Sequence, residues 1–61
     1  MEKTTYIYLL SEDLQMKIYE KLENDFLLDD EELQNAMDSR ICDLEELISF
    51  NEIKQLEKGG K

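Results

Sequence analysis

The feature of this chain that most limits its possible folds is a pair of apolar stripes that repeat at helical spacing. The apolar side chains of the longer stripe recur every three or four positions, at Leu33, Met37, Ile41, Leu44 and Ile48. That periodicity places them on one face of an α-helix. We therefore predict one helix over residues 30–47. Asp29 and Glu32 are three positions apart and have the spacing of an acidic capping box at its start.

A shorter stripe predicts a first helix over residues 12–25, because apolar side chains recur there at Leu14, Ile18, Leu22 and Phe26. Ser11 precedes this stripe and is a natural N-cap. A third, short helix is expected over residues 50–58. Ser49 and Glu52 have the spacing of a capping box at its start, and Gly59 is suited to end it.

Ahead of the helices, residues 4–10 form a β-branched and aromatic run that favours an extended strand. A single strand leaves its backbone N–H and C=O groups without partners. Two copies could pair their strands in an antiparallel ribbon, the strand could add to a sheet edge on a partner, or the segment could pack as irregular extended chain. The candidate residues for a dimer or partner strand are Tyr6, Ile7, Tyr8 and Leu9.

A length of 61 residues predicts one small domain, residues 1–61, of marginal stability. Cys42 is the sole cysteine and the chain has no histidine, so neither an internal disulfide nor a zinc site can supplement the core. Oligomerisation is the remaining route, and we expect a homodimer. The expected fold class is mainly α, with a short N-terminal β-strand, two amphipathic helices and a short C-terminal helix, dimerising through the strand.

The longest apolar run, from Tyr6 to Leu10, is far shorter than the roughly 20 residues that cross a bilayer, and no cleavage signal follows it. Together with the unpaired thiol, this predicts a cytoplasmic protein of a bacterial or infected host cell. The net charge of −9 predicts that the chain binds neither anionic membranes nor nucleic acid directly.

Negative charge is concentrated in the middle of the chain. Eleven of the sixteen carboxylates lie between Leu22 and Ile53, where Arg40 is the only base. Unbalanced carboxylates repel one another and lower stability, so their presence indicates a gain in solubility or a cationic partner. We expect the partner-binding acidic face to consist of Glu31, Glu32, Asp38, Asp43, Glu45, Glu46 and Glu52.

The residues do not indicate catalysis. A nucleophile needs a neighbouring base, the chain has no histidine, and Ser11 and Ser49 are explained by helix capping. The consecutive acids at residues 29–32 lack the alternate spacing and the glycine of a calcium loop. Both glycines lie near the C-terminus, which excludes a glycine-rich phosphate loop. We therefore predict no catalytic residues, no cofactor and no metal.

In size, acidity and lack of histidine, the chain resembles small phage and mobile-element inhibitors of host defence, anti-CRISPR proteins among them. The resemblance implies a non-enzymatic protein that masks a basic surface of a nucleic-acid-binding protein, as DNA mimics do. A helix over residues 30–47 would be roughly 27 Å long. Duplex DNA of that length carries about 16 phosphate charges, a density that the carboxylates approach when doubled in a dimer.

Two alternatives remain open. A strand followed by two helices resembles the layout of ribbon-helix-helix dimers, which implies a dimeric regulator or antitoxin. The DNA-reading strand of that family is polar and basic, whereas here its positions hold Thr4, Tyr6, Tyr8 and Leu10. The tyrosines could instead form a pocket between protomers, as in a small-ligand sequestering protein.

Overall fold

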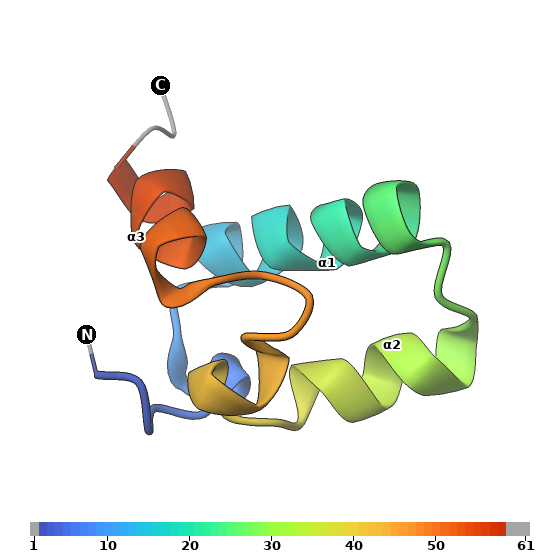
Figure 1. The fold of residues 1–61 in the computed structure, drawn as a ribbon, viewed down its shortest axis with the longest axis horizontal. Helices are drawn as coiled ribbons and strands as arrows, with labels where there is room; N and C mark the ends of the chain where they lie inside the picture. Colours follow the sequence, from blue (N-terminus) through green and yellow to red (C-terminus); the bar gives the residue numbers. More distant parts are fainter. Residues whose placement is uncertain (1, 59–61) are drawn as a thin grey trace.

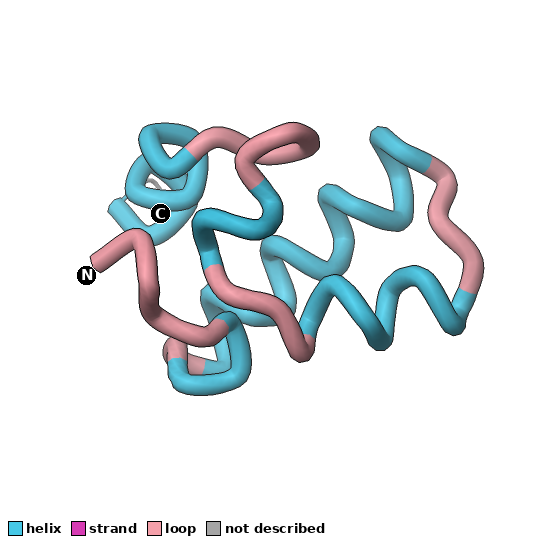
Figure 2. Tube along the Cα trace, turned by 60° about the horizontal axis from the view of Figure 1, so that its bottom comes forward, coloured by secondary structure: helices cyan, strands magenta, loops and turns pink. Residues whose placement is uncertain are grey.

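The computed structural model describes residues 2–58, whose helical elements surround one apolar core (Figure 1). In order they are the 3₁₀-helix η1 (Ile7–Leu9), α1 (Glu12–Phe26), α2 (Asp30–Met37), the 3₁₀-helix η2 (Ile41–Leu44) and α3 (Phe50–Lys58). α1 and α2 run antiparallel and are joined at one end of the molecule (Figures 1 and 2). η1, η2 and α3 gather toward the other end. The prediction of a mainly helical single domain is confirmed.

α1 begins and ends close to the predicted positions. The Ser11 hydroxyl accepts a hydrogen bond from the Leu14 N–H at 3.2 Å, which satisfies one of the unpaired donors of the first turn. The stripe residues Leu14, Ile18 and Leu22 are buried. The helix ends at Phe26, and the next residue, Leu27, has left-handed backbone geometry with a φ of 55°.

The core is built from every element of the described chain. Its ten buried side chains are Ile7, Leu14, Ile18, Leu22, Leu33, Ala36, Ile41, Leu44, Ile48 and Ile53. No polar or charged residue among residues 2–58 is buried. The predicted stripe members Leu33, Ile41, Leu44 and Ile48 therefore do face the core, as their spacing indicates.

The prediction of one helix over residues 30–47 is wrong. The Asp29–Glu32 capping box begins α2, with reciprocal hydrogen bonds of 2.8 and 3.1 Å, but α2 ends at Met37. Arg40 is extended, with φ −88° and ψ 163°, and η2 then begins at Ile41. The break is stabilised from outside the helix, because the Ser39 carbonyl accepts from the Ile7 N–H at 2.9 Å and the Ile41 N–H donates to the Thr5 carbonyl at 3.0 Å.

The prediction of a strand over residues 4–10 is also wrong. Within residues 2–58, the pairing in this region amounts to one isolated antiparallel bridge between Tyr6 and Arg40, and residues 7–9 turn into η1. Ile7 is fully buried while Tyr8 and Leu9 are both exposed, so the side chains do not alternate as a strand requires. The Ile7 N–H is already bonded to the Ser39 carbonyl within the chain, so this donor is not free to pair with a strand of a second copy or of a partner.

α3 occupies the predicted residues, but only half of its capping box forms. The Ser49 hydroxyl accepts from the Glu52 N–H at 3.2 Å, whereas the Glu52 carboxylate pairs with Lys21 at 3.3 Å. The predicted stop at Gly59 lies outside the described residues. Over residues 2–58, no helix combines the length and apolar character required to cross a bilayer.

The burial of Ile7 predicts how substitutions in the N-terminal segment change the stability of the protein. The substitution Ile7→Val should lower the free energy of unfolding by about 0.5 to 1.5 kcal/mol, because it removes a methyl group from a site with 0% exposure. Leu9→Ala is the control, since Leu9 is 65% exposed and should change stability by no more than about 0.5 kcal/mol. Urea unfolding measures both. Equal effects of the two substitutions would contradict this placement of the N-terminal segment.

Candidate protein-interaction surfaces

The seven predicted partner-binding acids are all exposed, but they do not form one continuous helical face. Glu31 and Glu32 lie in the first turn of α2, and Asp38 follows its last residue. The others are distributed over η2, the turn after it and α3, at Asp43, Glu45, Glu46 and Glu52. Because the helix breaks between Met37 and Ile41, the ridge expected over residues 30–47 is divided into separate groups.

Four of these acids make contacts within the chain. Glu32 and Asp43 each accept a backbone N–H at 3.1 Å, from Asp29 and Arg40 respectively. Glu45 pairs with Lys3 at 3.7 Å, and Glu52 pairs with Lys21 at 3.3 Å. Exposed ion pairs of this kind contribute little stability. Within residues 2–58, Glu31, Asp38 and Glu46 have no ion pair and no side-chain hydrogen bond.

A denser group of carboxylates lies where α1 joins α2. We call it the acidic end and define it by Glu23, Asp25, Asp29, Asp30, Glu31 and Glu32, together with Leu27. No Lys or Arg occurs between residues 22 and 39. The segment lies at the end of the molecule opposite η1 and α3 (Figure 1). The fold therefore leaves one end of the molecule strongly anionic.

The dipoles of α1 and α2 have opposite effects on the carboxylates of the acidic end. The first turn of α2 carries Asp30, Glu31 and Glu32, where negative charge is favourable at the positive end of the dipole. The last turn of α1 carries Glu23 and Asp25 and no base. Carboxylates there oppose the negative end of the dipole, and only Asp25 is compensated, by Lys21 at 3.0 Å. The acidic end thus contains negative charge that the fold itself does not favour.

Leu27 is the apolar member of the acidic end, and sequence reasoning missed it. Its side chain is 82% exposed, the highest value among the large apolar residues. Its φ of 55° is a conformation that glycine adopts at helix ends and that a residue with a Cβ adopts at a cost of roughly 1 kcal/mol. An apolar residue directly after the last helical position was the available signal. A leucine held there is neither a core residue nor a suitable helix stop.

The opposite end of the molecule carries a second surface, which we call the Tyr–Arg patch and define by Tyr6, Tyr8, Leu9 and Arg40. The Tyr6 and Tyr8 rings stack with centroids 5.2 Å apart. The Arg40 guanidinium lies 4.9 Å from the Tyr6 ring centroid and donates to the Tyr6 hydroxyl at 3.1 Å. That hydrogen bond is the main cause that raises the pKa of Arg40 above its ordinary value.

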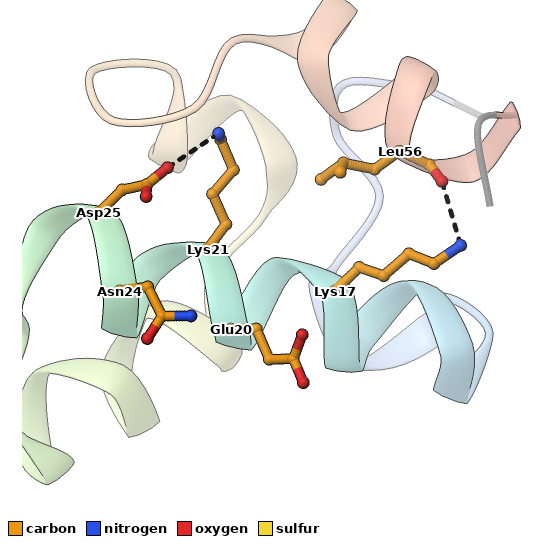
Figure 3. Close-up of a pocket in the computed structure, with 6 residues that line it drawn as sticks. All are labelled: Lys17, Glu20, Lys21, Asn24, Asp25 and Leu56. Atoms are coloured by element: carbon orange, nitrogen blue, oxygen red, sulfur yellow. Dashed lines mark hydrogen bonds and ion pairs between the residues drawn. The ribbon is translucent and has the colours of Figure 1, made fainter. Parts of the chain in front are cut away.

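An open groove of about 290 Å³ lies between α1 and α3, lined by Lys17, Glu20, Lys21, Asn24, Asp25 and Leu56 (Figure 3). Its lysines already have partners. The Lys17 ammonium donates to the Leu56 carbonyl at 3.3 Å and pairs with Asp13 at 3.1 Å. Hydrogen bonds to Asp25 and then Glu52 raise the pKa of Lys21. The groove is therefore explained by contacts that join α1 to α3.

In the part of the chain that the structure describes, no three His, Cys, Asp or Glu side chains are placed so that they could hold one metal ion. The chain matches no protein-family model, no curated protein and no solved structure. Its function is therefore inferred from its own surfaces.

The positive φ of Leu27 predicts that glycine at this position stabilises the protein. Leu27→Gly should raise the free energy of unfolding by about 0.5 to 1 kcal/mol, because glycine adopts a positive φ without strain and little apolar burial is lost. Leu28→Gly is the matched control at the next position, where the side chain packs against the core, and it should destabilise the protein. Thermal unfolding compares them. Destabilisation by Leu27→Gly would show that this leucine supports the fold.

Proposed function

We propose that this chain is a non-enzymatic interaction protein that binds a cationic surface of another protein through its acidic end. The observation that carries the proposal is Leu27, which is 82% exposed and lies in the sequence between two carboxylates before it and four after it, in a segment with no base. Charge alone is compatible with a role in solubility. A leucine held at a positive φ does not improve solubility, and the cost of this backbone conformation supports a binding role.

In such a surface, charged side chains and apolar side chains contribute to different properties of binding. Carboxylates steer a cationic partner and exclude anionic ones, which affects association rate and specificity more than affinity. Affinity comes chiefly from a few well-buried side chains near the centre of the interface. Leu27 supplies such an apolar centre, and Glu23, Asp30 and Glu31 supply the anionic surround. The partner that fits is a cationic surface with a small apolar depression.

A nucleic-acid-binding protein is the partner class that we propose, because such proteins carry the concentrated positive charge that this end complements. The contact would be compact. α2 has 8 residues and is therefore about 12 Å long, much shorter than the duplex-like ridge expected from an unbroken helix. Direct binding of nucleic acid is opposed by the net charge of −9. The cytoplasmic location stays a prediction.

A titration with a short lysine-rich peptide containing one phenylalanine tests the surface. We expect amide chemical-shift changes in NMR spectra to concentrate at residues 23–32 and binding to weaken as salt rises from about 50 to about 300 mM. Asp30→Asn combined with Glu31→Gln should weaken binding roughly threefold to tenfold, because each exposed charge pair contributes up to about 1 kcal/mol.

The matched control is Glu12→Gln combined with Asp13→Asn. These acids also lie in the first turn of a helix, α1, and their loss changes the net charge by the same amount. α1 begins at the end of the molecule away from the acidic end (Figure 1). Binding by the control variant should equal that of the wild type. Equal weakening by both double variants would mean that the peptide responds to net charge alone, and the acidic end would lose its assigned role.

A further inference from the structure

We infer that the cationic partner docks as a basic amphipathic α-helix along the solvent-facing side of α1. We call this side the outer face and define it by Met16, Glu20, Glu23 and Leu27. The inference rests on the proposed function, because Glu23 and Leu27 also belong to the acidic end. It adds the form of the partner, and it extends the contact back along α1 to Met16.

The outer face is the side of α1 that the fold leaves uncovered. α1 packs against α2 and α3, and it contributes Leu14, Ile18 and Leu22 to the core. Met16 and Glu20 each follow a buried residue by two positions, which is about 200° around the helix. All four side chains of the outer face are exposed. The outer face is therefore a helix face without a partner in the described chain, residues 2–58.

The four residues recur at the spacing of a helix–helix contact. They are separated by 4, 3 and 4 positions, as are the a and d positions at which two helices of a coiled coil meet. Leu27 follows the last helical residue, but its N–H still donates to the Glu23 carbonyl at 3.2 Å, so its Cα continues the path of the helix. Met16 and Leu27 are eleven positions apart, or about 16 Å along the axis. A straight seam of this kind fits a second helix.

The two ends of this seam are apolar. Met16 is 63% exposed and Leu27 is 82% exposed, and they are two of the five exposed large apolar residues among residues 2–58. A single exposed apolar residue is ordinary on a protein surface. Two at seam spacing on one helix face offer an apolar contact at each end of the same docked helix. The partner helix should therefore carry apolar residues eleven positions apart.

The middle of the seam carries the charge. Within residues 2–58, neither Glu20 nor Glu23 has an ion pair or a side-chain hydrogen bond. Two uncompensated carboxylates three positions apart are complementary to two Lys or Arg side chains at the same spacing. They repel nucleic acid, and they also repel a second copy of this chain, whose net charge is −9. Charge therefore identifies the occupant as a basic helix of another protein.

The lysines of α1 do not compensate these two carboxylates. Lys17 pairs with Asp13 at 3.1 Å, and Lys21 pairs with Asp25 at 3.0 Å and with Glu52 at 3.3 Å. Both lysines extend toward α3, on the flank of α1 that lines the groove (Figure 3). The pattern of the outer face is therefore apolar, acidic, acidic, apolar. Because this pattern reads the same in both directions, it fits a partner helix of either direction.

A titration with a synthetic helix tests the inference. The probe is an alanine- and glutamine-based peptide of about 20 residues, long enough to form a helix, with leucine, lysine, lysine and leucine at the seam spacing. We expect amide shifts over residues 16–27, a shift of the Met16 methyl signal, and NOEs from that methyl group to the peptide leucines. Because four side chains make a small contact, the dissociation constant should be roughly high micromolar to millimolar.

A control peptide has the same composition, with both lysines moved to the opposite side of its helix. It should bind at least about threefold more weakly than the seam peptide. Equal binding of the two peptides, or a Met16 methyl signal that does not move, would overturn the inference. The proposed function would still stand if the lysine-rich phenylalanine peptide bound at residues 23–32. If neither kind of peptide bound, both proposals would fail.

Two double variants of the protein locate the contact. Glu20→Gln combined with Glu23→Gln should weaken binding of the seam peptide roughly threefold to tenfold. The matched control is Asp38→Asn combined with Glu46→Gln, which changes the net charge equally at exposed acids outside α1 and should leave binding unchanged. Equal weakening by both would mean that the peptide responds to net charge alone, and it would contradict the assignment.

Met16→Ser tests the apolar part of the seam. It should weaken binding of the seam peptide roughly threefold to tenfold, because Met16 is the only apolar contact at its end of the outer face. The side chain is 63% exposed, so the urea midpoint should stay close to wild type and report that the variant is folded. Unchanged binding by the folded variant would confine the contact to the acidic end and overturn its extension along α1.

Discussion

The structure depends on the pairing of the N-terminal segment with the chain between α2 and η2. Three backbone hydrogen bonds join them, from Ile7 to Ser39, from Ile41 to Thr5 and from Cys42 to Lys3, at 2.9, 3.0 and 2.9 Å. These bonds replace helical hydrogen bonds that a continuous helix would form, so the number of satisfied backbone groups is kept. The pairing also brings Ile7, with 0% exposure, into the core. In a chain this small, one further buried isoleucine is a substantial part of the net stability.

The same pairing separates the molecule into two ends of different chemistry. It draws Arg40 onto Tyr6 and brings Lys3 to Glu45, so two bases lie beside η1 and η2, among the carboxylates of that region. The stretch between residues 22 and 39 is left without a base at the other end. The acidic end therefore suits a cationic partner, whereas the opposite end carries charges of both signs. An unbroken helix over residues 30–47 would not have placed Arg40 on the Tyr6 ring.

The sequence predicted the starts of the helices correctly, because each start is determined by residues close together in the chain. Ser11 begins α1, the Asp29–Glu32 box begins α2, and the Ser49 hydroxyl caps α3. The stripe from Leu33 to Ile48 correctly indicated burial, because a short turn of 3₁₀-helix directs Ile41 and Leu44 inward much as an α-helix would. The break itself could not be predicted, since it depends on bonds between segments more than thirty residues apart. Leu27 was missed because burial and charge patterns say nothing about a positive φ.

The most direct test of this account is a measurement of which carbonyl accepts the Ile41 N–H. Scalar coupling through the hydrogen bond, between the Ile41 amide nitrogen and a carbonyl carbon, identifies the acceptor by NMR. The account predicts a coupling to Thr5, whose carbonyl oxygen lies 3.0 Å from that nitrogen. A coupling to Met37, the acceptor in a continuous α-helix, would contradict it, and with it the division of the molecule into two ends.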